Sequence, residues 1–155
     1  MTELLFKRLQ RRDSQITDAE RDALARAVSE EIDLGPDTMI IREGQVADRA
    51  HLMLSGFASR FATLPGGRRR IQFLSMAGDF IDLQGFTLKH LDFSAVTLTA
   101  CRLAVIPHDR LREISETMPH LTRLLWLSTV VDAAIQRQWL LSAGQRSALQ
   151  RLAHL

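Results

Sequence analysis

Residues 78–107 read GDFIDLQGFTLKHLDFSAVTLTACRLAVIP, and the pattern of this stretch indicates the fold. It begins with a Gly-Asp turn, passes through a loop, and ends in two β-type segments at 95–98 and 103–106. Further β-type segments precede it, with Gly, Pro or Asp between them, at 39–41, 51–54, 57–63 and 70–74. Short strands at this close spacing predict an antiparallel sandwich or jelly roll, so the fold class is mainly β with flanking helices.

One helix is predicted before the β region and another directly after it. Thr17 and Glu20 form a capping box, which starts a helix from about residue 18 to residue 29. Pro107 ends the last β-type segment, and residues 108–116 are expected to form a short helix. These helices carry apolar stripes and should pack on the β region.

A long helix is predicted from Pro119 to about Leu141. It is apolar nearly all round, and a helix of that kind must be covered on every side. One face can lie on the sandwich, and we expect the other to pack on the same helix of a second copy. The alternative is a helix buried centrally within one large domain. The predicted dimer-interface residues are Leu124, Leu127, Val131, Ala134 and Gln138.

The chain has 155 residues, 46% of them hydrophobic, which fits one globular domain with a single sizeable core. We expect a β-barrel sensor domain with N-terminal helices at 1–118, a dimerisation helix at 119–141, and a further helix in 142–155 after a break at Ser142-Ala143-Gly144. The apolar stripe of that last helix is unfinished at Leu155. The natural chain is therefore expected to continue, or a partner to cover the stripe.

Composition and motifs argue against several other classes of protein. No apolar run approaches the ~20 residues that span a bilayer, so we expect a soluble, cytoplasmic protein with no membrane partner. The single cysteine, Cys101, can form neither an internal disulfide nor a four-thiolate iron–sulfur site, and is expected in the core. Neither a His-x-His pair nor a Gly-x-Ser-x-Gly motif occurs, so no metal site and no catalytic residue is predicted. The basic run Arg68–Arg70 is interpreted as a solvated hairpin tip.

The order of these elements and several local motifs resemble the effector domain of Crp/Fnr regulators. In that family the region similar to residues 78–107 forms the phosphate-binding cassette and the two strands after it, and the region similar to 146–153 leads into a winged helix-turn-helix. The resemblance implies a double-stranded β-helix like that of cyclic-nucleotide-binding domains, a homodimer, and DNA binding through a C-terminal domain absent from this chain. The matching segments are Gly78–Ile81, Ser94–Val96, Leu98–Cys101, Leu103–Pro107, Glu43-Gly44, Leu54–Gly56 and Arg146–Ala153.

The side chains that bind cyclic AMP in this family are missing here. The family's ribose-binding Glu falls on Leu83 and its phosphate-binding Arg on Phe93, while Asp82 and Asp92 are expected to bring negative charge toward the phosphate position. Cyclic AMP is therefore not expected to bind in the usual way, and no cofactor is predicted. The candidate pocket residues for an unknown small-molecule effector are Gly78, Asp79, Phe80, Asp82, Leu83, Gln84, Phe93 and Ser94.

Several interpretations of the barrel interior stay open. Phe80, Phe86 and Phe93 either fill the barrel or form the apolar wall of an effector pocket. A haem sensor would need an axial ligand such as His90, although a lone loop histidine is more often a solvated residue. The sequence favours the effector-sensing and dimerisation domain of a bacterial transcription regulator, which is not an enzyme. The alternative is a cyclic-nucleotide-binding regulatory module of another signalling protein.

Overall fold

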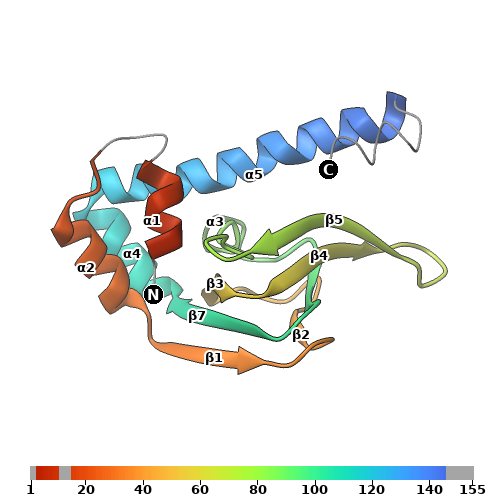
Figure 1. The fold of residues 1–155 in the computed structure, drawn as a ribbon, viewed down its shortest axis with the longest axis horizontal. Helices are drawn as coiled ribbons and strands as arrows, with labels where there is room; N and C mark the ends of the chain where they lie inside the picture. Colours follow the sequence, from red (N-terminus) through yellow and green to blue (C-terminus); the bar gives the residue numbers. More distant parts are fainter. Residues whose placement is uncertain (1–2, 11–14, 146–155) are drawn as a thin grey trace.

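The computed structural model describes residues 3–10 and 15–145. Three helices gather at one end of the β region, and the longest helix runs along one side of it (Figure 1). The elements are α1 (Glu3–Gln10), α2 (Asp18–Ala27), β1 (Glu30–Leu34), β2 (Met39–Ile41), β3 (Arg49–Ser55), β4 (Phe57–Thr63), β5 (Arg69–Met76), α3 (Gly85–Leu88), β6 (Ser94–Thr97), β7 (Cys101–Pro107), α4 (His108–Thr117) and α5 (Pro119–Gln145).

The strands form two antiparallel sheets, as the spacing of β-type segments predicts. One sheet has the order β1-β7-β3 and the other β2-β6-β4-β5. Strand β1 was not among the predicted strands because its sequence, EEIDL, is rich in acids and poor in β-branched residues. It forms because all five of its residues pair with β7, from Glu30 opposite Val105 to Leu34 opposite Cys101. Tertiary pairing therefore overrides local propensity at this edge.

The helix ends follow the local signals closely. The Thr17 hydroxyl accepts from the Glu20 amide at 3.3 Å, and a Glu20 carboxylate oxygen accepts from the Thr17 amide at 2.9 Å, which confirms the capping box. The pKa of Glu20 is lowered: burial alone would raise it, but the hydrogen bonds from Thr17 and His120 outweigh that effect.

The turn between β3 and β4 requires glycine. Gly56 has φ +86°, and a Cβ at this position would lie 2.3 Å from the carbonyl oxygen of Ala100 and 2.7 Å from the sulfur of Cys101. Any other residue would meet both an unfavourable backbone conformation and a steric clash. Cys101 itself is buried and unpaired, as expected of a small core residue. Arg68–Arg70 lie exposed at the β4–β5 hairpin, which confirms the solvated hairpin tip.

Two predictions about the long helix are wrong. Helix α5 does not break at Ser142-Ala143-Gly144 but continues to Gln145, since a single interior glycine costs a helix only about 1 kcal/mol. Leu124 does not face a partner. It is 2% exposed and packs in the core with Leu121 and Leu125, against α1, α2 and α4. The expected helix after 145 lies outside the described residues.

Candidate functional site

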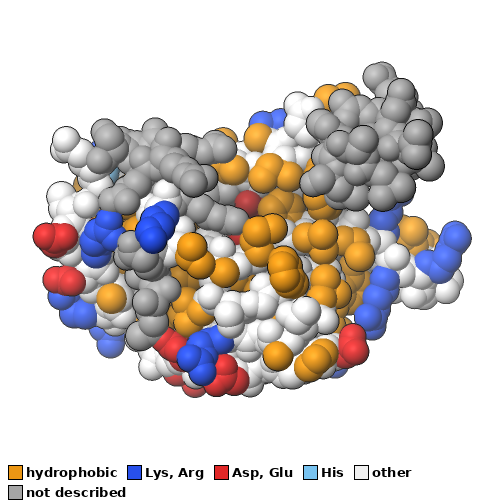
Figure 2. All heavy atoms as spheres, viewed as in Figure 1, with side chains coloured by type: hydrophobic (Ala, Val, Ile, Leu, Met, Phe, Trp, Pro, Cys, Tyr) orange, Lys and Arg blue, Asp and Glu red, His pale blue; other side chains and the backbone are white. Residues whose placement is uncertain are grey.

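A groove of about 790 Å³ lies between α5 and the β4–β5 side of the barrel. Figure 2 shows hydrophobic side chains gathered over α3, β4 and β5 on the face beside α5. The groove combines such apolar walls with charged and amide side chains, which is the make-up of a ligand site. Its lining residues are Arg60, Arg70, Ile71, Gln72, Gln84, Leu88, Asp92, Phe93, Thr129, Asp132, Ala133, Gln136, Arg137, Trp139 and Leu140.

A buried arginine stands at the centre of this site. Arg60 of β4 is 2% exposed, and its guanidinium lies 4.0 Å from the ring centroid of Phe73 and 5.6 Å from that of Phe93. Its Nη2 donates to a carboxylate oxygen of Asp132, on α5, at 2.7 Å. A cation therefore does reach the neighbourhood of Phe93, but it comes from β4 and not from the cassette.

The Arg60 guanidinium is incompletely satisfied. Its Nε has no hydrogen-bond partner among the described residues, although the atom is buried. An arginine cannot escape this situation by losing its proton, because its pKa lies above about 12. A buried donor left without an acceptor costs about 1–3 kcal/mol, partly offset here by the two aromatic faces. The site therefore holds one open hydrogen-bonding position next to a permanent positive charge.

The same residues join the barrel to the long helix. Asp132 is the only acidic residue in 119–145, and it is the one that meets Arg60. About two turns further along, Trp139 stacks on Phe73 with ring centroids 6.1 Å apart and planes inclined by 27°. Any change at Arg60 or Phe73 is therefore felt directly by α5.

The structure divides the predicted pocket residues into two groups. Gln84 and Phe93 line the groove, together with Asp92. Ser94 instead accepts a hydrogen bond from the Glu43 amide at 3.0 Å and ties β6 to the turn after β2. The Gly78–Phe80 turn lies outside the groove and lines a smaller cavity of about 80 Å³ beside α1.

The expected role of Asp82 is wrong. Its carboxylate is 1% exposed and accepts from the His51 amide at 2.6 Å, while its other oxygen lies 2.7 Å from Nδ1 of the same histidine. A buried carboxylate has to find donors, and His51 on the neighbouring strand β3 supplies two. Asp82 consequently does not line the groove, and Leu83 is buried in the helix-side core. Of the two acids, only Asp92 adds negative charge to the groove lining.

Another buried histidine lies close to the Asp82–His51 pair. His108, the first residue of α4, is buried and packs edge-on against Phe86 with ring centroids 5.5 Å apart. Burial lowers the pKa of His108, because a charged imidazolium would lose its hydration, and the negative charge of Asp82 offsets only part of that effect. Phe86 is thus half-buried against α4 and does not fill the barrel, whereas Phe80 and Phe93 are buried in the core.

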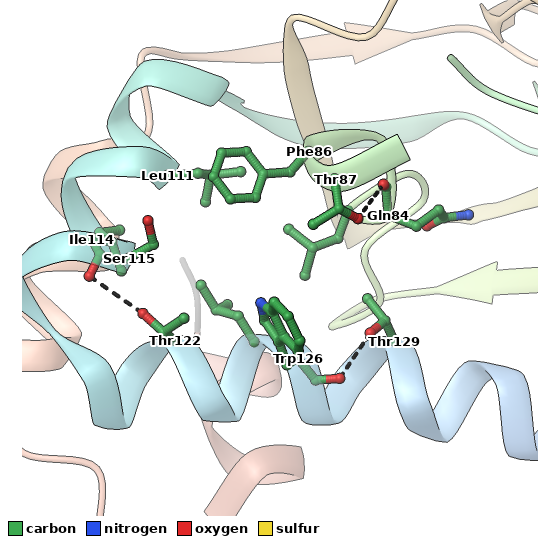
Figure 3. Close-up of a pocket in the computed structure, with 11 residues that line it drawn as sticks. Gln84, Phe86, Thr87, Leu111, Ile114, Ser115, Thr122, Trp126 and Thr129 are labelled. Carbon is green, nitrogen blue, oxygen red and sulfur yellow. Dashed lines mark hydrogen bonds between the residues drawn. The ribbon is translucent and has the colours of Figure 1, made fainter. Parts of the chain in front are cut away.

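A separate apolar cavity of about 170 Å³ lies where α3, α4 and α5 meet. Figure 3 shows Phe86, Leu111 and Trp126 around it, with three threonines at its edge. The hydroxyls of these threonines already donate to backbone carbonyls: Thr87 to Gln84, Thr122 to Met118, and Thr129 to Trp126. The cavity offers apolar contact and little else.

Helix α5 carries several apolar side chains that the barrel leaves exposed. Trp126, Val130 and Leu140 follow the spacing i, i+4 and i+14, which places them along one stripe of the helix. Leu140 is the most exposed of them, at 74%. Of the predicted interface residues, Leu127, Val131 and Ala134 are half-buried and Gln138 is exposed. The most exposed apolar residues of the helix are Trp126, Val130, Leu140 and Leu141.

The described residues can also be searched for metal ligands, for a haem ligand and for membrane-spanning helices. Across residues 3–10 and 15–145, no three His, Cys, Asp or Glu side chains come close enough together to hold a metal ion. His90 is exposed in the loop before β6. Within the same ranges, each helix is too short or too polar to span a lipid bilayer.

The sequence interpretation missed the central residues of the groove. Arg60 is the one charged residue of β4, and Asp132 is the one acid of the long helix, so each is unusual in its own segment. These two unusual charged residues were the features of the sequence that could have indicated the site. Their pairing across 72 positions of sequence could not be read from either segment alone.

Comparison with known proteins agrees with the fold. The family model for the cyclic nucleotide-binding domain matches residues 31–118. A probable transcriptional activator of Rhizobium leguminosarum bv. viciae is 30% identical over 117 residues, covering 75% of this chain and 48% of that protein. The transcriptional activatory protein AadR of Rhodopseudomonas palustris is 30% identical over 129 residues, covering 81% of this chain and 52% of that protein.

Solved structures show the same architecture. FixK2 from Bradyrhizobium japonicum superposes with a TM-score of 0.74 at 20% identity, covering 81% of this chain and 62% of that one. This chain spans about half the length of the curated relatives it matches. The matched family model, the regulators among the relatives and the shared fold lead to one conclusion: the chain belongs to the cyclic nucleotide-binding domain family, in the Crp/Fnr type of bacterial transcription regulators.

Proposed function

We propose that this chain is the effector-sensing and dimerisation domain of a cytoplasmic transcription regulator, and that a C-terminal domain outside this chain reads DNA. The observation that carries the proposal is the exposed apolar stripe of α5, the same helix that contacts the barrel through Asp132 and Trp139. One helix that contacts both the sensor pocket and a second copy can pass a change from one to the other.

The dimer seam is best assigned to one stripe of α5. Trp126, Val130, Ala133, Arg137 and Leu140 follow the i, i+4, i+7, i+11 and i+14 spacing of a coiled-coil seam. None of the five belongs to the core cluster that holds Leu121 and Leu124, and Ala133, Arg137 and Leu140 lie at the edge where α5 also lines the groove. This register is shifted by about one residue from the predicted one. The reason is that the barrel already covers the side that holds Leu124.

Light scattering after gel filtration tests the seam. The unmutated protein should be a dimer at micromolar concentration, and Val130→Glu should shift it toward monomer by placing charge in the seam. Ile135→Glu is the matched control, because Ile135 is an exposed apolar residue of the same helix on another side. A monomeric wild type, or equal disruption by both variants, would contradict the two-fold arrangement.

Cyclic AMP is not the effector in this proposal. Phe93 and Leu83 occupy the positions of the family's phosphate- and ribose-binding side chains, and the acid Asp92 lines the groove. Calorimetry of the purified protein with cyclic AMP measures this directly. A dissociation constant in the low micromolar range or better would refute this part of the proposal.

DNA binding is assigned to the missing domain. Specific readout needs side chains presented to base edges, usually from a recognition helix in the major groove. A band-shift assay should compare this chain with the full reading frame on the DNA upstream of its own gene. Sequence-selective binding by the 155-residue chain alone would overturn the assignment.

A further inference from the structure

We propose that the groove binds a small molecule that carries an oxyanion, a carboxylate or a phosphate ester, on an apolar body, and that this oxyanion takes the place of Asp132 on Arg60. The inference rests on the proposed function, since it names the chemistry of the effector that the domain senses. It assigns the anion to a cation on β4, whereas the family resemblance implies one in the cassette.

The guanidinium of Arg60 has a hydrogen-bond donor that is not yet satisfied. Nη2 donates to a carboxylate oxygen of Asp132 at 2.7 Å, and Nε has no partner among the described residues. A carboxylate or phosphate that binds an arginine side-on accepts from Nε and Nη2 together. Such a ligand would keep the ion pair and also satisfy the open donor, which Asp132 in its present position does not do.

The position of Asp132 allows a ligand to displace it from Arg60. Its side chain is 23% exposed, while that of Arg60 is 3% exposed. The aspartate already meets water on one side, whereas the arginine is held by the rings of Phe73 and Phe93 and stays in place to receive another anion. Exchange of one carboxylate for another conserves the charge next to Arg60.

The rest of the groove suits the body of such a ligand. Ile71, Leu88, Phe93, Trp139 and Leu140 supply apolar contact. Two more arginines, Arg70 and Arg137, line the same groove, so its three cations outnumber the acids Asp92 and Asp132. A net positive lining with apolar walls favours an amphipathic anion over a neutral or cationic molecule.

Binding would act on α5 directly. The Arg60–Asp132 bond joins β4 to the long helix, and its replacement by a ligand breaks that bond while Phe73 and Trp139 remain stacked beside it. The ligand thus competes with a residue of the dimer helix for one cation. This gives the effector a means of changing how α5 is held.

Calorimetry with three probes of the same shape tests the chemistry. Benzoate, phenyl phosphate and the neutral isostere benzamide are titrated into the wild-type protein and into Asp132→Asn. Benzoate, phenyl phosphate or both should bind while benzamide does not, and Asp132→Asn should bind the successful anion several-fold more tightly, because its competitor is gone. Which anion binds more tightly identifies a carboxylate or a phosphate as the effector's headgroup.

Variants of Arg60 provide the second arm. Arg60→Met should weaken anion binding by about tenfold or more, since it removes two charge-assisted hydrogen bonds. Arg42→Met, on an exposed loop outside the groove, should leave binding unchanged. If Arg60→Met does not fold, thermal unfolding decides: benzoate or phenyl phosphate should raise the melting temperature of Asp132→Asn more than that of wild type.

Several results would overturn the inference. These are no anion binding by Asp132→Asn, equal binding of benzamide, or anion affinity that is the same in wild type and Asp132→Asn. None of these outcomes depends on whether the protein is a dimer in light scattering. Failure of the ligand assignment is therefore separable from failure of the proposed function.

Discussion

Removing Asp132 should destabilise the domain far more than its partly exposed position suggests. Asp132→Ala leaves the Arg60 guanidinium, whose side chain is 3% exposed, without its counter-ion. Breaking a buried ion pair from one side costs about 3–5 kcal/mol. Because Asp132 borders the groove and water can reach part of the vacated space, we expect a smaller loss than that, about 2–3 kcal/mol. For a domain of this size that corresponds to a loss of roughly 5–10 °C in melting temperature.

A double-mutant cycle separates the charge from the packing. Arg60→Met removes the cation and keeps an apolar stem between Phe73 and Phe93, and the Asp132 side chain is already partly exposed to water, so it should cost only about 1 kcal/mol. The double variant should then be about as stable as Arg60→Met alone, which gives an interaction free energy of about 2–3 kcal/mol.

The assay is denaturant unfolding followed by circular dichroism, at one fixed protein concentration because dimerisation adds to the measured stability. If Asp132→Ala unfolds within about 0.5 kcal/mol of wild type, or if the two single effects simply add, the ion pair is not the link between barrel and helix that the geometry indicates.

Three further predictions concern other parts of the fold. Because burial lowers the pKa of His108 below 6.5, the unfolded chain binds the proton more readily, so stability should fall as the pH drops below about 6.5. His108→Asn should flatten a plot of melting temperature against pH over this range, and an unchanged slope would contradict the assignment. Gly56→Ala should cost at least about 2 kcal/mol in chemical unfolding, against about 1 kcal/mol for Gly44→Ala, which shares a positive φ but meets no neighbouring atom; equal losses would argue against the clash with Ala100. Leu121→Ala should cost about 2–5 kcal/mol of stability, whereas Leu140→Ala should leave the barrel intact and weaken only the dimer in gel filtration; the reverse order would mean that the two faces of α5 are misassigned.

Local chemistry in the sequence was enough to place most of the elements. Capping at Thr17, the proline at 119 and the turn glycines act over three or four residues, so the helix starts and the strand reversals can be read from neighbouring letters. The absence of a cassette arginine could be read in the same way, once the resemblance located Phe93. The β1 strand could not, because its acids disfavour a strand and only pairing with β7 stabilises it.

The site itself was decided by tertiary structure. The sequence indicated that α5 is apolar nearly all round, but only packing shows that Leu124 is buried in the core while Leu140 is exposed. Likewise residues 60, 82 and 132 are charged, and the orientation of each side chain depends on its nearest partner in space. Asp82 contacts His51, and Arg60 contacts Asp132. A buried charge must be neutralised by whatever the fold brings within about 3 Å, and neighbours of that kind are set by how strands and helices pack, not by their order along the chain.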